Sequence, residues 1–563
     1  MFRVKLLLAL PCLAAVLFVF ILPYGAALGS AFGGGLLSVW ENRSLPAITL
    51  FTLKQAFFSV LVSLAIGLPG AWFLGHSRPL LRSVSAIPFA MPSILVVLGF
   101  VLFWGNAGWL NQFIALFPGM EPLRILYRPE AIVLAHGFLN FPLVIRLAGD
   151  GMARAKMAYG PAAANLGASP LMRALTVVLP LAFPAIMSAA LLVFLYSFTS
   201  FAVVLVLGGG PASTTLAVEI FRHARIFLNY QNAGALALAE TLIAVLVFLA
   251  YVFFSRRSRA IKTDIQDTGF REKRSPAGLV LMLAYGLFLA VFILGPLLSI
   301  VVESLLERPS RGAGQFFSVR WWSSLGDSSL PALFRSLLLA FLSATTACFL
   351  AIGAAASLEM RGGIRAMRGI RGKLGKCSGI QGLFADSWAN LLKFFAAAPL
   401  ISSGIVLGLG WMVLYGRSFA RAPWVLVLLH AVIALPFAFN SISEGFRSLP
   451  AKIMDAAANL GAGPLRSLFT IAIPLSLKRI RSAWGFAAAL SLGELNAVMM
   501  LGMEGWETLP LYIYRAAGAY RYGAACAAGS LLMLCCAACF LLSEVSVKTS
   551  AKPSVSPLEK SIT

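Results

Sequence analysis

The sequence predicts an all-α integral membrane protein with about twelve transmembrane helices, arranged as two parallel repeats of six. Three observations lead to this fold class. Of the 563 residues, 60% are hydrophobic and 12% are charged, which is more apolar surface than a soluble protein of this size could cover. The apolar residues gather in runs long enough to span a bilayer. Finally, the decapeptide AAANLGASPL at 162–171 returns as AAANLGAGPL at 456–465.

Each apolar run provides the ~20 residues that a helix needs to cross ~30 Å of hydrocarbon. Helices are expected because backbone groups in lipid have no water to bond, and the alternation typical of a barrel is absent. The expected spans are 5–29, 55–75, 84–105, 130–149, 184–207, 233–254, 277–302, 333–357, 390–415, 424–443, 482–503 and 523–543.

The first run is expected to remain as a span, because its apolar stretch is too long for a cleaved signal peptide. The chain holds 45 Lys and Arg against 21 Asp and Glu, a formal net charge of +24. Most of the basic residues fall in segments that are inside if the N-terminus is inside, so we expect both termini in the cytoplasm. The basic clusters are expected to face anionic lipid headgroups, and no interleaved aromatic residues suggest nucleic acid.

A duplication organises the chain. Position 456 lies 294 residues after 162, and the same offset pairs His136 with His430 and Pro142 with Pro436. A constant offset over such a distance indicates a tandem repeat. An even number of spans in each repeat gives both the same orientation. The expected domains are a first repeat (1–254), a cytoplasmic linker (255–276), a second repeat (277–547) and a cytoplasmic tail (548–563).

A short polar segment follows the fourth span of each repeat, and we call these segments the coupling loops (161–180 and 455–474). Their pattern predicts a short helix, a glycine turn, a second short helix and a proline stop. Pro161 suits the first helical position, and Asp455 could cap a helix N-terminus. Gly167 and Gly461 are expected to turn with positive φ. A smooth face for another protein is expected from Ala162, Ala163, Ala456 and Ala457.

This spacing resembles the EAA loop of ABC-importer permeases: Glu-Ala-Ala, three residues, Gly, nine residues, Ile, one residue and Leu-Pro. Pro180 and Pro474 match the final proline, whereas Pro161 and Asp455 replace the glutamate. In that family the loop forms coupling helices that sit in clefts of the ATPase subunits. The resemblance implies the type I importer permease fold in a bacterial inner membrane. It also implies two copies of an ATPase subunit at the cytoplasmic face and an extracytoplasmic solute-binding protein.

Four further segments resemble fused permeases for thiamine, and ferric-iron permeases share the same layout. They are LAHGFLNFPLVIRL (134–147), FTSFAVVLVLGGGPASTT (198–215), LSLGEL (490–495) and TLPLYIYRAAGAYRYGA (508–524). The resemblance implies a permease for thiamine or its phosphates, with ferric iron or another small solute left open. It covers both repeats but not the basic segment 359–389, to which we assign no function.

No catalytic, cofactor or metal site is expected in this chain. The nearest phosphate-loop candidate, Gly369 to Ser378, is one residue too long and has Cys377 where a hydroxyl should hold magnesium. ATP and Mg are therefore expected in the separate ATPase subunit. Six of the seven cysteines lie in apolar spans, and none forms a paired CxxC metal motif.

Ionisable residues inside spans are costly and mark functional sites by default. Glu494 is the strongest candidate and has Asn496 two positions on, whereas the first repeat offers only the uncharged Thr199 and Ser200. A carboxylate there could complement a cationic solute or bond between helices. These four residues are the expected translocation path. Weaker candidates are Glu240 and Asp150, while His136 and His430 are expected to pack and hydrogen-bond rather than bind metal.

Two other classes of protein were weighed. An ion-coupled secondary transporter also often has twelve spans in two parallel repeats, but it needs more intramembrane charge and gives no reason for duplicated loops. A membrane-embedded enzyme would need paired carboxylates, HExxH or a Ser/His constellation at a membrane face, and the sequence contains none.

Overall fold

The computed structural model describes residues 2–33, 45–74, 87–208, 210, 213–259, 276–307, 316–326, 329–359, 380–420, 422–503 and 505–548. Most of the predicted linker (260–275), most of the basic segment (360–379), the phosphate-loop candidate and the tail after 548 lie outside these residues.

The first repeat contains α1 (Phe2–Ala15), η1 (Val16–Ile21), α2 (Leu22–Gly29), η2 (Ser30–Phe32), α4 (Leu45–Leu74), α6 (Ile87–Ala90), α7 (Ser93–Trp104), α8 (Trp109–Ile114), α9 (Pro129–Asn165), α10 (Pro170–Arg173), η3 (Ala174–Val178), α11 (Leu179–Phe198), α12 (Ala202–Leu207), α13 (Leu216–Phe221), η5 (Arg222–Ile226) and α14 (Tyr230–Arg259).

The second repeat contains α15 (Pro276–Glu303), β1 (Leu306–Glu307), β2 (Phe316–Phe317), α16 (Arg320–Ser323), α17 (Ser329–Glu359), α19 (Ile380–Ala397), η6 (Ala398–Ile401), α20 (Gly404–Ala420), α21 (Pro423–Arg447), α22 (Ala451–Asn459), α23 (Pro464–Ser467), η7 (Leu468–Ala472), α24 (Ile473–Leu475), α25 (Leu477–Gly493), α26 (Asn496–Leu501), α27 (Leu509–Gly518) and α28 (Tyr522–Lys548).

The predicted all-α membrane fold is confirmed. Ten of the described helices are long and apolar enough to cross a membrane, and a pair bent by 101°, Trp388–Ile401 with Gly404–Gly416, gives an eleventh crossing. The remaining expected span corresponds to α25, which is 17 residues long. Each apolar run is predicted to form one helix. This prediction is wrong for the four runs 84–105, 184–207, 390–415 and 482–503, because the helix in each is interrupted by a break.

The duplication extends to the helix boundaries. The helices α9 and α21 begin at 129 and 423, α10 and α23 at 170 and 464, and α12 and α26 at 202 and 496, each pair 294 residues apart. The π-helical segments η3 and η7 occupy corresponding positions within the second half of each coupling loop. The two repeats therefore share one plan, although α9 is continuous where the second repeat is divided into α21 and α22.

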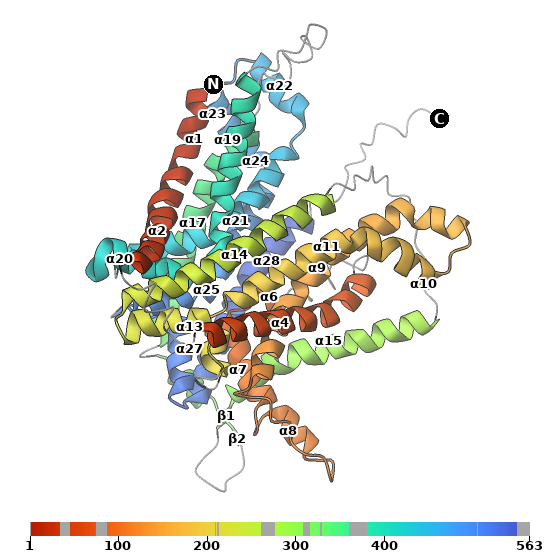
Figure 1. Ribbon diagram of the computed structural model, residues 1–563, viewed down its shortest axis with the longest axis vertical. Coiled ribbons are helices and arrows are strands. Elements are labelled where there is room, and N and C mark those ends of the chain that lie inside the picture. The colour runs from red at the N-terminus through yellow and green to blue at the C-terminus, as the bar shows by residue number, and fades with distance from the viewer. Residues whose placement is uncertain are drawn as a thin grey trace.

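The repeats exchange their first helices. The helix α2 packs on α20, where Gly410 leaves no room for a Cβ beside the carbonyl of Pro23 and Trp411 Nε1 donates to the Val19 carbonyl at 3.0 Å. In the other direction α15 packs on α7, where Gly99 lies against the carbonyl of Pro296. Figure 1 shows α1 among α17 and α19 of the second repeat, and α15 beside α4 of the first. Each repeat is therefore completed by a helix of the other.

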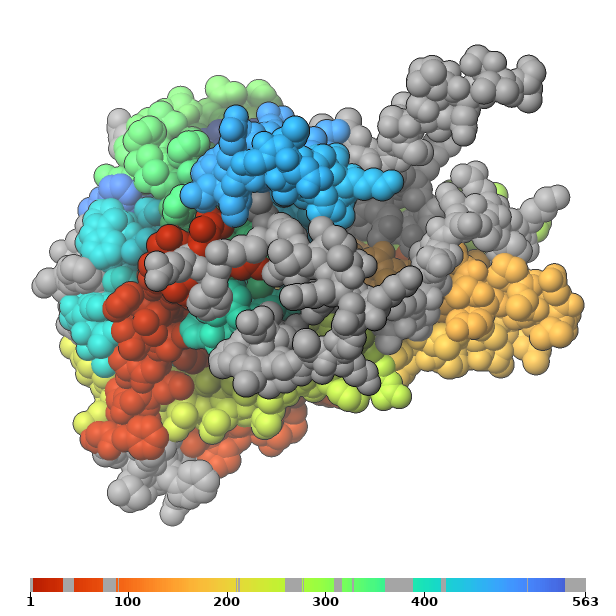
Figure 2. Space-filling view, turned by 90° about the horizontal axis from the view of Figure 1, so that it is seen from above, coloured from red at the N-terminus to blue at the C-terminus, as the bar shows by residue number. Residues whose placement is uncertain are grey.

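Two arms extend from the centre of the molecule. In Figure 1, α9, α10 and α11 reach to the right, whereas α21, α22 and α24 reach upward beside the N-terminus. The coupling loops stand at the far ends of these arms, and Figure 2 shows both on one face of the molecule. A partner that binds both loops must therefore bridge the two arms.

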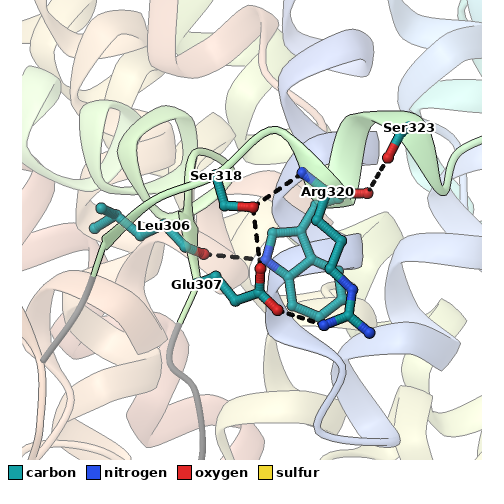
Figure 3. A network of polar contacts seen from close by, with 6 residues as sticks. Leu306, Glu307, Ser318, Arg320 and Ser323 are labelled. Carbon is teal, nitrogen blue, oxygen red and sulfur yellow. Dashed lines mark hydrogen bonds and ion pairs between the residues drawn. The ribbon is translucent and has the colours of Figure 1, made fainter. Parts of the chain in front are cut away.

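A small hairpin lies at the opposite end from α22 (Figure 1). Its strands β1 and β2 pair antiparallel, and Figure 3 shows Glu307 accepting hydrogen bonds from Ser318 and Arg320. These contacts lower the pKa of Glu307 below its ordinary value. The hydrogen bond from Arg320 has the larger effect, and that from Ser318 the next largest. Trp321 Nε1 donates to the Leu306 carbonyl at 3.0 Å, and its ring covers Gly523 of α28. The hairpin is therefore fixed to the last span.

Candidate functional site

Four interrupted helices meet near the centre of the molecule. The breaks fall between α6 and α7, between α11 and α12, between η6 and α20, and between α25 and α26. Backbone groups freed by such a break cannot face lipid, so they must line a cavity or be buried in protein. The broken helices of transporters commonly form substrate sites at this depth.

A cavity of about 250 Å³ lies where the breaks meet, at the lower end of ligand-pocket volumes. All four breaks contribute to its wall. The predicted path residues Thr199, Ser200, Glu494 and Asn496 all line it. The remaining lining residues are Phe89, Ser93, His136, Leu139, Asn140, Tyr196, Phe201, Ala202, Val203, Ser402, Ser403, Gly404 and Ile433.

Glu494 stands at the end of α25 and faces the break before α20. Its Oε1 accepts a hydrogen bond from the Ala497 amide at 3.1 Å, which satisfies a free donor at the start of α26. A Cβ added at Gly404 would lie 3.0 Å from the same oxygen, so the backbone of the facing break is close by. No Lys or Arg is among the lining residues. The carboxyl group therefore gives the cavity an acidic character.

A polar cluster from the first repeat forms another part of the wall. His136 Nδ1 lies 3.1 Å from Gln55 Oε1 and 3.3 Å from Ser59 Oγ, and Asn140 Nδ2 donates to Ser197 Oγ at 3.2 Å. The matched His430 Nδ1 lies 2.8 Å from Ser491 Oγ. Hydrogen bonding by both histidines is confirmed. The described residues contain no group of three or more metal-ligating side chains.

Glu240 and Asp150, the weaker candidates, do not line the cavity. Glu240 is 2% exposed on α14 and lies close to Ser403, which does line it. Asp150 lies further along α9, toward the first coupling loop. Sequence reasoning missed most of the wall, including Phe89, Tyr196 and Ser403. The short polar segments that interrupt the apolar runs at these breaks could have indicated the position of the wall.

The glycine turns of the coupling loops are confirmed. Gly167 has φ +80° and Gly461 has φ +79°, and nothing lies within 4 Å of a Cβ added at either position. Leu166 and Leu460, the residues immediately before them, are each 88% exposed. The two loops thus present matching exposed apolar tips.

The helix starts predicted for these loops are wrong at both Pro161 and Asp455. Pro161 lies inside α9, which continues to Asn165, and it does not begin a helix. The helix α9 packs on α11 before this point, where Gly151 lies against Ala185. Asp455 is the fifth residue of α22, which begins after Pro450, and so it is not a cap.

The proline stops are also corrected, because Pro180 and Pro474 are the second residues of α11 and α24. Each proline follows a π-helical turn without a gap, so it lies within a continuous helix, Pro170–Phe198 or Pro464–Leu475, rather than at a helix end. The alanines lie beside the glycine turns: Ala162 and Ala456 are exposed, Ala163 is half-buried and Ala457 is 7% exposed.

Two fused repeats, exchanged first helices and a cavity lined by broken helices define a membrane transport permease. No family model matches the chain. It is 28% identical over 546 residues to the thiamine transport system permease protein ThiP of Brucella abortus (strain 2308), covering 94% of each chain. It is 27% identical over 530 residues to ThiP of Salmonella typhimurium (strain LT2), covering 92% of this chain and 91% of the relative.

A further relative matches only part of this chain. The spermidine/putrescine transport system permease protein PotB of Salmonella typhimurium (strain SL1344) is 26% identical over 225 residues, 39% of this chain and 77% of the relative. The resemblance to fused, two-repeat ABC-importer permeases is confirmed along nearly the whole chain, with the ThiP permeases as full-length relatives.

Proposed function

We propose that this chain is the membrane-spanning subunit of an ATP-driven importer, and that its solute is thiamine or a thiamine phosphate. The observation that carries the proposal is similarity to ThiP permeases over 94% of the chain, through both repeats. The acidic cavity supports it, because thiamine carries a permanent positive charge on its thiazolium ring and Glu494 can complement that charge.

The motor in this proposal is a pair of ATPase subunits, which bind ATP and Mg and dock on the two coupling loops. The exposed tips Leu166 and Leu460 support such docking. Closure of the ATPase pair would draw the two arms together and move the repeats as rigid bodies. The N-terminal end of α1 lies at the same end as α22 (Figure 1), which supports a cytoplasmic N-terminus.

A solute-binding protein is proposed to deliver the solute at the opposite face, to the loops 208–232 and 503–522. Within the first of these, Glu219 accepts hydrogen bonds from Thr214 and Arg222 at 3.0 and 2.7 Å. Gly502 of the second repeat leaves no room for a Cβ beside the Arg225 guanidinium. These contacts support a rigid outer surface joined across the two repeats.

A polyamine is the second candidate solute, because PotB is partly similar and the cavity is acidic. The deciding experiment reconstitutes this chain with its ATPase and binding protein in proteoliposomes. ATP-dependent uptake of radiolabelled thiamine is expected, with no uptake when the ATPase is omitted. Uptake of spermidine alone would favour the second candidate. Thiamine uptake driven by an ion gradient without the ATPase would overturn the proposed mechanism.

A further inference from the structure

A row of four aromatic rings runs from the cavity into the second repeat. The ring of Phe89 lies 6.1 Å from that of Tyr196 and 6.3 Å from that of Phe486, and Phe486 lies 5.2 Å from Phe437, all between centroids. Phe89 and Tyr196 line the cavity, whereas Phe486 and Phe437 are not among its lining residues. The row therefore presents two rings to a bound solute and supports them from behind.

The duplication shows that the fold itself does not need these rings. At the offset of 294, Tyr196 corresponds to Leu490, Phe486 to Leu192 and Phe437 to Leu143. Leucine fills the equivalent place of these three rings in the other repeat. The aromatic row is thus a departure from the symmetry of the fold, and it adjoins the cavity.

The acidic side of the cavity breaks the same symmetry. Glu494 corresponds to Ser200, and Asn496 to Ala202. The cavity consequently has one aromatic wall, formed by α6 and α11, and one acidic wall at the break between α25 and α26. A symmetric fold with an asymmetric lining suits a solute that itself has different faces.

We infer that Phe89 and Tyr196 are specificity-determining residues that hold a flat aromatic cation by its ring faces, opposite the carboxyl group of Glu494. The aromatic faces attract positive charge and stack on other rings, while the carboxyl group supplies the opposite charge. A linear aliphatic polyamine meets the same carboxyl group but has no ring to stack. This inference rests on the proposed function, since it names what the same cavity recognises.

The test measures binding to the purified complex of this chain with its ATPase in lipid nanodiscs, without the binding protein. The probes are radiolabelled thiamine, spermidine and choline, a quaternary ammonium without a ring. Phe89→Leu and Tyr196→Leu are the test variants, because leucine already occupies the position that matches Tyr196. Phe437→Leu is the matched control, from the same row but away from the cavity. Tyr196→Phe keeps the ring and removes the hydroxyl.

Each ring-removing variant is expected to weaken thiamine binding about tenfold, as the loss of stacking and cation–π contact with a desolvated ring implies. Binding by Phe437→Leu should stay within about twofold of the parent chain, and Tyr196→Phe should restore most of the thiamine affinity that Tyr196→Leu loses, because it restores the ring. Spermidine and choline should bind more weakly than thiamine. Ring removal should affect spermidine little, and it should weaken choline binding less than thiamine binding, because choline loses cation–π contact but no stacking. All variants must first purify with the ATPase as the parent does.

The two proposals fail in different ways. If the complete transporter takes up thiamine, but ring removal leaves thiamine binding unchanged or the parent complex binds none at millimolar concentration, the aromatic wall is overturned and the proposed function stands. If the complete transporter takes up no thiamine, the proposed function fails and the inference fails with it. A thiamine affinity lowered equally by Phe437→Leu would also overturn the inference, since the effect would then be packing.

Discussion

Glu494 combines a local structural hydrogen bond with a position on the cavity wall. It lines the cavity, and it satisfies the Ala497 amide at the start of α26 while lying close to Gly404 of the facing break. An ionisable group at membrane depth is costly, and such groups usually face a cavity that serves transport. The matched Ser200 fits the same break without a charge, so the fold does not require the acid.

Glu494→Gln is therefore expected to lower thiamine uptake at least tenfold while leaving assembly intact. The amide can still accept from the Ala497 amide, but it no longer attracts a cation, and the loss of a charged contact in a desolvated site is worth about 1.5–3 kcal/mol. Uptake and ATPase co-purification should be measured together. Glu444→Gln is the control, since Glu444 is an exposed carboxylate 3.8 Å from Arg479. Parent-level uptake by Glu494→Gln would remove this residue from the path.

Some residues of the cavity could be identified from the sequence, and others could not. Thr199, Ser200, Glu494 and Asn496 were identifiable because they are polar within apolar runs. Phe89 and Tyr196 were not, because an aromatic residue in an apolar span looks like any lipid-facing or buried side chain. Their role depends on which spans meet at the cavity, and that depends on the exchange of helices between the repeats.

Among the helices, hydropathy predicted where the chain crosses the membrane but not where a crossing breaks. The fragments on either side of a break, such as α11 and α12, are both apolar, so averaging hydropathy over a window joins them.

The coupling loops show the same limit of sequence reasoning. Their glycine turns follow from the sequence, because positive φ strongly favours glycine. The continuation of α9 through Pro161 does not follow from the sequence, because a proline in this setting usually begins a helix.

The glycine turns give a prediction at this scale. Gly167→Val and Gly461→Val should each uncouple ATP hydrolysis from transport, because a side chain at positive φ costs about 1–2 kcal/mol and reshapes the apolar tip. Uptake should fall at least fivefold, and hydrolysis should lose its stimulation by loaded binding protein. Both activities are measured in proteoliposomes.

Gly463→Ser is the matched control for these variants. Gly463 has φ −68° and open space around it, and the first repeat already carries Ser169 at the equivalent position. This variant should couple as the parent chain does. Normal stimulated hydrolysis and uptake in both valine variants would contradict the assignment of the coupling loops.

For the whole molecule, the exchange of first helices decides how the two repeats hold together. The contacts of Gly99 with Pro296 and of Gly410 with Pro23 are equivalent in the two directions, so each repeat grips the other through a helix that the other supplies. Fusion into one chain then ensures that every molecule contains one copy of each of the two different repeats. It also permits the asymmetric cavity, because two identical subunits could not place an acid on one side and rings on the other.

If the exchanged helices hold the repeats together, the covalent linker is dispensable once the chain has folded. A protease site placed within 260–275 should allow complete cleavage of the purified chain while both halves stay together in size-exclusion chromatography. Introducing Gly99→Val and Gly410→Val should make the cleaved halves separate, because each side chain would meet backbone that cannot move aside. Gly286→Val on α15, where a Cβ meets nothing within 4 Å, should leave them associated. Separation of the unmodified halves after cleavage would mean that the linker, rather than the exchanged helices, maintains the pairing.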